Sequence, residues 1–423
     1  MIALLFVSCS SDENTPAPTP TPIPVDPALD SQVFPDPNFR SVIAEITGIP
    51  EGETIPAEVI ASITSIDVHE KNISSLKGIE LFTELTTLDC YDNQLTQLDV
   101  SSNTKLTRLA CSSNQLTQLD VSNNTQLTSL LCGDNQLTQL NVSNNTKLTD
   151  LSCSDNQLTQ LDVSNKAQLT SLICFNNRLT QLDVSNDTEL ASLICFNNRL
   201  TQLDVNNNTG LTTLDCHNNQ LTQLDVSNST QLAGLLCYKN QLKQLDVSSN
   251  TKLTDLLCNS NQLAQLDVSS NTKLTDLDCN DNQLTQLDVS NNTKLEYLKC
   301  YKNRLTQLDV SNNTELIMLR CYYNQLTQLD LSNNAELTDL DCSQQIHLPF
   351  QSLPDGKYGV RISDKTDATR VQSLMFDWLP TTCNIEEYEG HKYLIISYET
   401  YIVTYNYKCS STKSMSVHID VDD

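Results

Sequence analysis

Cysteine is the residue whose spacing most invites a chemical interpretation, because thirteen cysteines recur every 21 residues. They are Cys90, Cys111, Cys132, Cys153, Cys174, Cys195, Cys216, Cys237, Cys258, Cys279, Cys300, Cys321 and Cys342. Equivalent side chains on stacked coils would point in parallel about 4.8 Å apart, whereas a disulfide needs Cβ atoms about 3.5–4.5 Å apart. No His occupies this register, and a metal site needs converging ligands. We therefore expect reduced, buried thiols that pack as small apolar residues.

Other reactive groups form no recognisable catalytic arrangement. The five histidines share no motif, and the chain has no Gly-rich phosphate loop, H-E-x-x-H, G-x-S-x-G or C-x-x-C sequence. The histidines are His69, His217, His347, His391 and His418. We expect a protein that is not an enzyme and that carries no cofactor and no metal site of this kind.

The elements that hold the cysteines follow from the leucines around them. The first unit reads Leu85-x-x-Leu88-x-Cys90-x-x-Asn93, and a similar half follows from Leu95 to Asn103. Apolar residues alternate with polar ones in both halves, which predicts short strands on two sides of each coil. One unit cannot bury its six apolar residues alone, so the units must stack into a solenoid of about 12 coils.

The repeated pattern L-x-x-L-x-[C/V]-x-x-N resembles that of the leucine-rich repeat family, in the nested subclass in which both halves of a 21-residue unit carry the motif. The resemblance covers Leu85 to Cys342. It implies a mainly β fold and a binding face on the first strand of each coil.

Two asparagine columns accompany the leucines. One runs from Asn93 to Asn324 without a break, and the second runs from Asn103 to Asn334 with departures at Lys166, Asp187 and Ser229. An Asn side chain inside a turn can satisfy backbone groups of neighbouring coils. We interpret both columns as structural.

The charge of the chain limits its partners. The formal net charge is −27, with no basic stripe to offset it, which argues against nucleic acid as a partner. Part of this charge is a column of aspartates from Asp99 to Asp330 that is broken only by Asn141. The column either keeps the solenoid soluble and blunts strand edges, or forms a row of weak divalent-cation sites.

The N-terminal residues resemble an export and lipidation signal. Val7-Ser8-Cys9 ends an apolar run and is similar to a bacterial lipobox, which implies acylation of Cys9; the other interpretation is an apolar N-terminus without this role. The acidic stretch after Cys9 resembles the surface-export signal of Bacteroidetes lipoproteins. Residues 1–9 are therefore expected to be the signal segment and 10–29 a Pro/Thr-rich tether. The resemblance implies a lipid-anchored protein on the outer face of the outer membrane, whose only membrane contact is this anchor.

The segments on either side of the repeats have different compositions. Residues 30–84 predict a helical N-terminal cap, with Asp36 as the N-cap of a helix, and resemble the cap of internalin-like surface proteins. The solenoid is expected over 85–345. Residues 346–423 predict a small β-rich domain, similar to the β-sandwich that often follows internalin-like repeats. It contains a hairpin around Glu389-Gly390 and a disulfide between Cys383 and Cys409 that an exported domain could form.

The outward positions of the first half-unit vary, whereas the second half repeats Leu-Thr-Gln-Leu-Asp-Val-Ser almost unchanged. Apolar residues flank the central cysteines and predict a contiguous exposed patch, and a basic and aromatic cluster follows it. The candidate partner-binding residues are Leu131, Ile173, Phe175, Ile194, Phe196, Leu236, Tyr238, Leu257, Tyr297, Tyr301, Arg320 and Tyr322, with Lys299, Lys302 and Tyr323 beside the last four.

The sequence thus favours a cell-surface lipoprotein that recognises or adheres to a protein partner, of host or bacterial origin, through this variable face. The first alternative is a glycan-binding surface lipoprotein, because aromatic and basic side chains also suit sugars. The second is a solenoid spacer or scaffold with weak divalent-cation sites along the Asp column.

Overall fold

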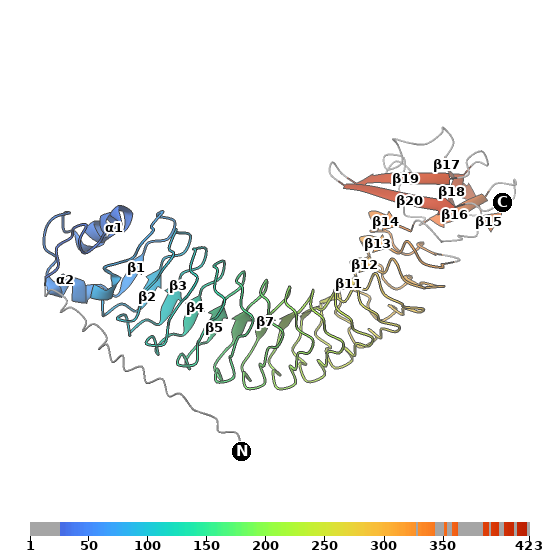
Figure 1. Ribbon diagram of the computed structural model, residues 1–423. Helices are drawn as coiled ribbons and strands as arrows, with labels where there is room; N and C mark the ends of the chain where they lie inside the picture. The colour runs from blue at the N-terminus through green and yellow to red at the C-terminus, as the bar shows by residue number, and fades with distance from the viewer. Residues whose placement is uncertain are drawn as a thin grey trace, which may run out of the picture.

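The computed structural model describes residues 26–326 and 329–342, together with strands at 351–352, 358–362, 384–388, 391–396, 402–409 and 413–420. Figure 1 shows a curved row of stacked coils, with two helices at one end and the last strands of the chain at the other. The mainly β solenoid expected from the repeat is confirmed, and 14 strands follow one another in a single sheet.

The sheet is parallel, and each strand pairs with the strand one coil further on. Thirteen of its strands have the same offset of 21 residues, so that Leu88 pairs with Leu109 and Leu109 with Leu130. The strands are β1 (Ser65–Asp67), β2 (Thr87–Asp89), β3 (Arg108–Ala110), β4 (Ser129–Leu131), β5 (Asp150–Ser152), β6 (Ser171–Ile173), β7 (Ser192–Ile194), β8 (Thr213–Asp215), β9 (Gly234–Leu236), β10 (Asp255–Leu257), β11 (Asp276–Asp278), β12 (Tyr297–Lys299), β13 (Met318–Arg320) and β14 (Asp339–Asp341).

The core is one continuous column of apolar side chains inside the coils. In the first unit Leu85, Leu88, Cys90, Leu95 and Val100 are all fully buried. All thirteen repeat cysteines are buried and unpaired, which confirms the packing expected from their spacing. Burial raises the pKa of these thiols, to about 12 at Cys132, because a thiolate would lose its hydration.

The first asparagine column ties each coil to its neighbours. The Asn114 side-chain Nδ2 donates to the carbonyl oxygens of Cys90, Cys111 and Ser112 at 3.0–3.2 Å, while its Oδ1 accepts from the Leu95 N–H at 2.9 Å. The same set of bonds recurs along the column, as at Asn198. These side chains bond the carbonyl oxygens of the turns after the strands and so join neighbouring coils.

In the described part of the solenoid, the second row of strands expected from the repeat is present only as isolated bridges, which join Asp99 to Asp120 and Asp120 to Asn141. Side chains replace the missing backbone pairs. Asp99 Oδ1 accepts from the Ser101 N–H, and Asn124 Nδ2 donates to the Val100 and Asn103 carbonyls. Because these backbone groups are already bonded, a regular ladder is not needed there.

A small helical unit covers the first coil. Helix α1 (Pro37–Thr47) begins after Asp36, whose side chain accepts from the Asn38 and Phe39 N–H groups, and α2 (Ala57–Ser62) follows. The second Asp36 oxygen accepts from the Ser74 N–H and hydroxyl at 2.7 Å, which joins α1 to the loop after β1. Phe34, Phe39 and Phe82 pack together, next to the short 3-10 helix η1 (Ile79–Leu81), and close this end of the core.

Antiparallel strands follow the solenoid. One sheet contains β15 (Gln351–Ser352), β16 (Tyr358–Ile362), β18 (His391–Ile396) and β17 (Asn384–Tyr388), and a separate pair consists of β19 (Ile402–Cys409) and β20 (Lys413–Asp420). Strands β17 and β18 form the predicted hairpin, with Tyr388 opposite His391. Strand β20 lies against β14, at the end of the solenoid sheet (Figure 1).

Candidate functional site

The outward side of the parallel sheet is formed by the first and third residue of each strand, together with the residue after the cysteine that follows the strand, and we call this surface the strand face. The middle Leu of each strand points into the core, while its two neighbours are half-buried in most coils, as in β6 and β7. Residues equivalent by the 21-residue repeat therefore form columns along the strand face. Seven of the twelve predicted partner-binding residues lie on the strands, and the other five lie in the column after the cysteine.

The predicted aliphatic residues end their strands, and all five are half-buried between neighbours of the same column. They are Leu131, Ile173, Ile194, Leu236 and Leu257. The aliphatic residues do not form a continuous column by themselves, because Ser152 separates Leu131 from Ile173 and Asp215 separates Ile194 from Leu236.

A continuous column of rings is formed instead by the residues that immediately follow the repeat cysteines. Phe175, Phe196, His217 and Tyr238 lie on four consecutive coils and stack face to face, and we call them the ring stack. Centroid separations are 4.4, 4.3 and 4.1 Å, with interplanar angles of 6–13°. The coil spacing of a parallel sheet places equivalent rings at about this distance. The four side chains are half-buried, and the ring faces between consecutive coils are covered by one another.

A hydrogen-bonded His–Asp pair lies at the ring stack. His217 Nδ1 lies 2.6 Å from Asp215 Oδ1, and both side chains are mostly buried. Asp215 interrupts the aliphatic column but supplies the hydrogen-bond partner of the imidazole. Burial raises the pKa of the neighbouring Tyr238 hydroxyl, and the negative charge of Asp215 adds to this effect.

A strip of amides runs beside the ring stack, in a left-handed turn that each coil makes. Asn176, Asn197 and Asn218 have φ of 51–52°, a conformation that Asn tolerates better than most residues. Each Nδ2 donates to the preceding coil at 2.6 Å, and the strip ends at the Oδ1 of Asp155. This strip was not predicted from the sequence, where its only signal is the run of Asn immediately before the first asparagine column.

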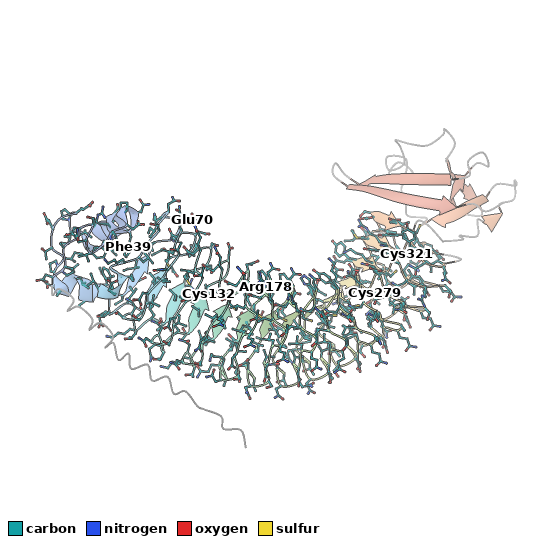
Figure 2. All side chains as sticks on the ribbon, in the orientation of Figure 1. Phe39, Glu70, Cys132, Arg178, Cys279 and Cys321 are labelled. Atoms are coloured by element: carbon teal, nitrogen blue, oxygen red, sulfur yellow. The ribbon has the colours of Figure 1, made fainter. Side chains whose placement is uncertain are left out.

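Two arginines at this edge were also missed. Arg178 and Arg199 follow the amide strip on the coils of Phe175 and Phe196, and both are exposed. Figure 2 shows Arg178 near the middle of the solenoid, along the same edge of the arc as Glu70. Neither guanidinium has a hydrogen-bond or ion-pair partner within the described part of the chain.

The second predicted cluster lies over β12 and β13. Tyr301 and Tyr322 stack at 4.2 Å, and Tyr323, which is 40% exposed, meets Tyr322 edge to face. Tyr297 begins β12 and is half-buried.

The cations of this second cluster are partly neutralised. Arg320 Nη2 is 2.9 Å from Asp339, and Lys299 Nζ is 3.7 Å from Asp278. Lys302 and Arg304 are exposed at the turn edge. This region is therefore less basic than the sequence suggests.

Metal and thiol chemistry have little support in the described residues. No group of three or more His, Cys, Asp or Glu side chains in this part of the chain converges as a metal site would require.

Within the described residues no helix is long and apolar enough to cross a membrane. The predicted lipidation site Cys9 lies outside the described residues, as does Cys383; Cys409 ends β19, where only the backbone is described.

Comparisons with known proteins agree with this geometry. No protein family model matches the chain. It is similar to the functional domain of InlJ from Listeria monocytogenes, described as including a cysteine ladder, with 34% identity, a TM-score of 0.72 and coverage of 93% of this chain and 98% of that domain. It is also similar to the internalin InlF of strain 4b F2365 of the same species, with 26% identity, a TM-score of 0.62 and coverage of 75% and 92%.

The curated relatives match over a shorter stretch. Internalin J of Listeria monocytogenes serotype 4b (strain F2365) is 44% identical over 71 residues, which is 17% of this chain. The matched stretch spans only 8% of that relative's length.

Proposed function

We propose that this chain, which belongs to the internalin-like leucine-rich repeat proteins, binds a protein partner through the strand face of its central coils, β6 to β10. The ring stack is the observation that carries this proposal. Four aromatic rings on consecutive coils, beside aliphatic residues on the same strands, form an apolar surface on a chain of net charge −27. Solvent-accessible apolar surfaces of this kind usually mark interaction sites.

The chemistry of the ring stack suits a protein partner. Aromatic residues are enriched at the energetic centres of protein interfaces, because they bury a large area at a low cost in side-chain entropy. Each ring is already held by its neighbours in the stack, so little further conformational freedom is lost on binding. The opposite side of the coils repeats nearly the same polar residues and offers no comparable surface.

Glycan binding is the second candidate, and the cluster over β12 and β13 favours it. Tyr323 is 40% exposed, and its neighbours include the exposed cations Lys302 and Arg304. Sugars stack on ring faces, however, and the inner faces of the ring stack are covered by neighbouring rings. A glycan would therefore bind over β12 and β13 and not at the ring stack.

We also propose that the protein acts at a cell surface, where a lipid on Cys9 and the tether over 10–29 hold it to the outer membrane. The support is the lipobox-like sequence Val7-Ser8-Cys9 and the proline content of the tether. The partner would then be a protein of a host or of another bacterium.

The experiment is affinity capture from host and bacterial surface extracts, with wild type compared with the Phe175→Ser/Phe196→Ser variant. Both rings lie outside the core, so the variant should keep its fold and nearly its melting temperature. A true partner should be captured by wild type and by the control Gln181→Ala/Gln202→Ala, and its affinity for the Phe variant should fall by about 2 kcal/mol or more. Equal capture by all three proteins would move the site away from the ring stack.

A further inference from the structure

One column of the repeat contains a departure that the fold does not require. The residue after the first asparagine column is Gln in most coils, as at Gln157 and Gln220, and it is Arg at Arg178, Arg199 and Arg304. All three arginines lie on coils with an aromatic residue after the cysteine. Gln serves the fold equally well on neighbouring coils, so the two arginines beside the ring stack call for a different explanation.

The two arginines within the solenoid strands have partners, whereas Arg304, in the same column as Arg178 and Arg199, forms no ion pair or side-chain hydrogen bond in the described residues. Arg108 pairs with Asp89 at 3.0 Å, and Arg320 pairs with Asp339 at 2.9 Å. Arg178 and Arg199 are exposed and have no such partner among the described residues, although acidic residues outnumber basic ones by 52 to 25 in the whole chain. Two adjacent guanidinium groups repel each other unless an anion lies between them.

The neighbours of these arginines define an ordered surface on two consecutive coils. From the strand outward, each coil presents an Ile, a Phe of the ring stack, an Asn of the amide strip and then the Arg. The Phe rings are 4.4 Å apart, and the amides are linked at 2.6 Å. An apolar group and an anion could therefore bind side by side on the same pair of coils.

We infer that the segment recognised at the ring stack carries an apolar side chain followed closely by a carboxylate, which Arg178 and Arg199 bind while the apolar side chain packs on Phe175 and Phe196. This inference rests on the proposed function. The planar guanidinium matches a carboxylate with two parallel hydrogen bonds. The positive charge of the guanidinium groups, which no acidic residue of the described chain pairs with, is complementary to the negative charge of such a partner. The carboxylate could belong to an Asp or Glu side chain or to a free C-terminus.

The test uses the full chain and an array of N-acetylated synthetic decapeptides. Each peptide has Leu, Phe or Trp at a fixed position, Glu or Gln at one of the next three positions, and a free or amidated C-terminus. Wild type is compared with Arg178→Gln/Arg199→Gln, which restores the common residue of the column, and with Arg304→Gln as the control in the same column. The Phe175→Ser/Phe196→Ser variant and an array of sulfated glycans complete the set.

Wild type and Arg304→Gln should prefer carboxylate peptides to their amide counterparts by about tenfold or more, with the preference weakened by added salt. The double Arg variant should lose that preference but keep weak binding, whereas the Phe variant should bind no peptide. The Glu/Gln pairs and the two C-termini distinguish the sources of the carboxylate.

Two results would overturn the inference. Binding that depends on the Phe rings but is equal for Glu and Gln peptides would leave the proposed function intact and remove the role of the arginines. Binding of sulfated glycans that depends on Arg178 and Arg199, without peptide binding, would assign the arginines to a different class of ligand. Peptide binding that is insensitive to the Phe change, or no peptide binding at all, would count against both the inference and the ring stack as a protein-binding site.

Discussion

Asp187 occupies a position in the second asparagine column where an amide is needed. Elsewhere in this column, as at Asn208, Nδ2 donates to two carbonyl oxygens of the preceding coil. Asp187 is fully buried, and neither of its oxygens has a hydrogen-bond partner. Burial raises its pKa to about 7, although the neighbouring Lys166, also fully buried, partly opposes this. The coils of Lys166 and Asp187 therefore lack the two Nδ2 hydrogen bonds that an Asn in this column donates to the preceding coil.

The prediction is that Asp187→Asn stabilises the solenoid, by about 1–3 kcal/mol if the two missing bonds form. The native carboxyl keeps its proton up to about pH 7, whereas in the unfolded chain it loses it near pH 4. Wild-type stability should fall as pH rises through this window, since the unfolded state then binds fewer protons. The gain in melting temperature should thus be larger at pH 8 than at pH 4.5. The reverse change Asn208→Asp should be destabilising, and a gain independent of pH would contradict the role given to the carboxylate.

At the scale of the element, the inward positions of each coil could be predicted from sequence alone. Leucine spacing gave the strands, and cysteine spacing gave buried thiols, because a 21-residue period leaves one way to stack the coils. The second row of strands could not be predicted correctly, because Asp99 and Asn124 side chains take backbone partners that a strand would use. The amide strip and Arg178 were missed, because their signal is a departure from the repeat and not the repeat itself.

The cysteine column should behave as a packed element. At pH 8 a maleimide should label few of the thirteen thiols in native protein and nearly all of them after denaturation, because burial keeps them protonated and inaccessible. Cys216→Asp should cost several kcal/mol in the free energy of unfolding, because it buries an unpaired carboxylate. Rapid native labelling, or disulfides within the column found by mass spectrometry, would refute this packing.

At the scale of the whole molecule, the solenoid is covered at both ends. The helices α1 and α2 cover the first coil, and β20 lies against β14 at the last. Such covers are required because the terminal coils of a solenoid would otherwise expose their core. This leaves the strand face and the repetitive opposite side as the surfaces on which a partner can bind along the stack.

The membrane attachment of the molecule is predicted to depend on one residue. Expressed with its native signal, the protein should partition into detergent and incorporate labelled palmitate, and Cys9→Ala should abolish both. The Cys383→Ala variant serves as the control and should remain lipidated. Wild-type protein that stays in the aqueous phase without label would exclude the anchor.

The most direct test of the central claim places a bulky group on one side of the coils or the other. Because the thirteen repeat thiols are buried, a cysteine introduced at Ser192 on the strand face, or at the exposed Gln202 on the opposite side, can be modified selectively with a polymer maleimide in a background in which Cys9, Cys383 and Cys409 are replaced by Ser. The measurement is the Kd for the captured partner before and after modification. We expect that modification at Ser192 abolishes binding and that modification at Gln202 leaves the Kd unchanged. Retained binding at Ser192 together with loss at Gln202 would contradict this expectation.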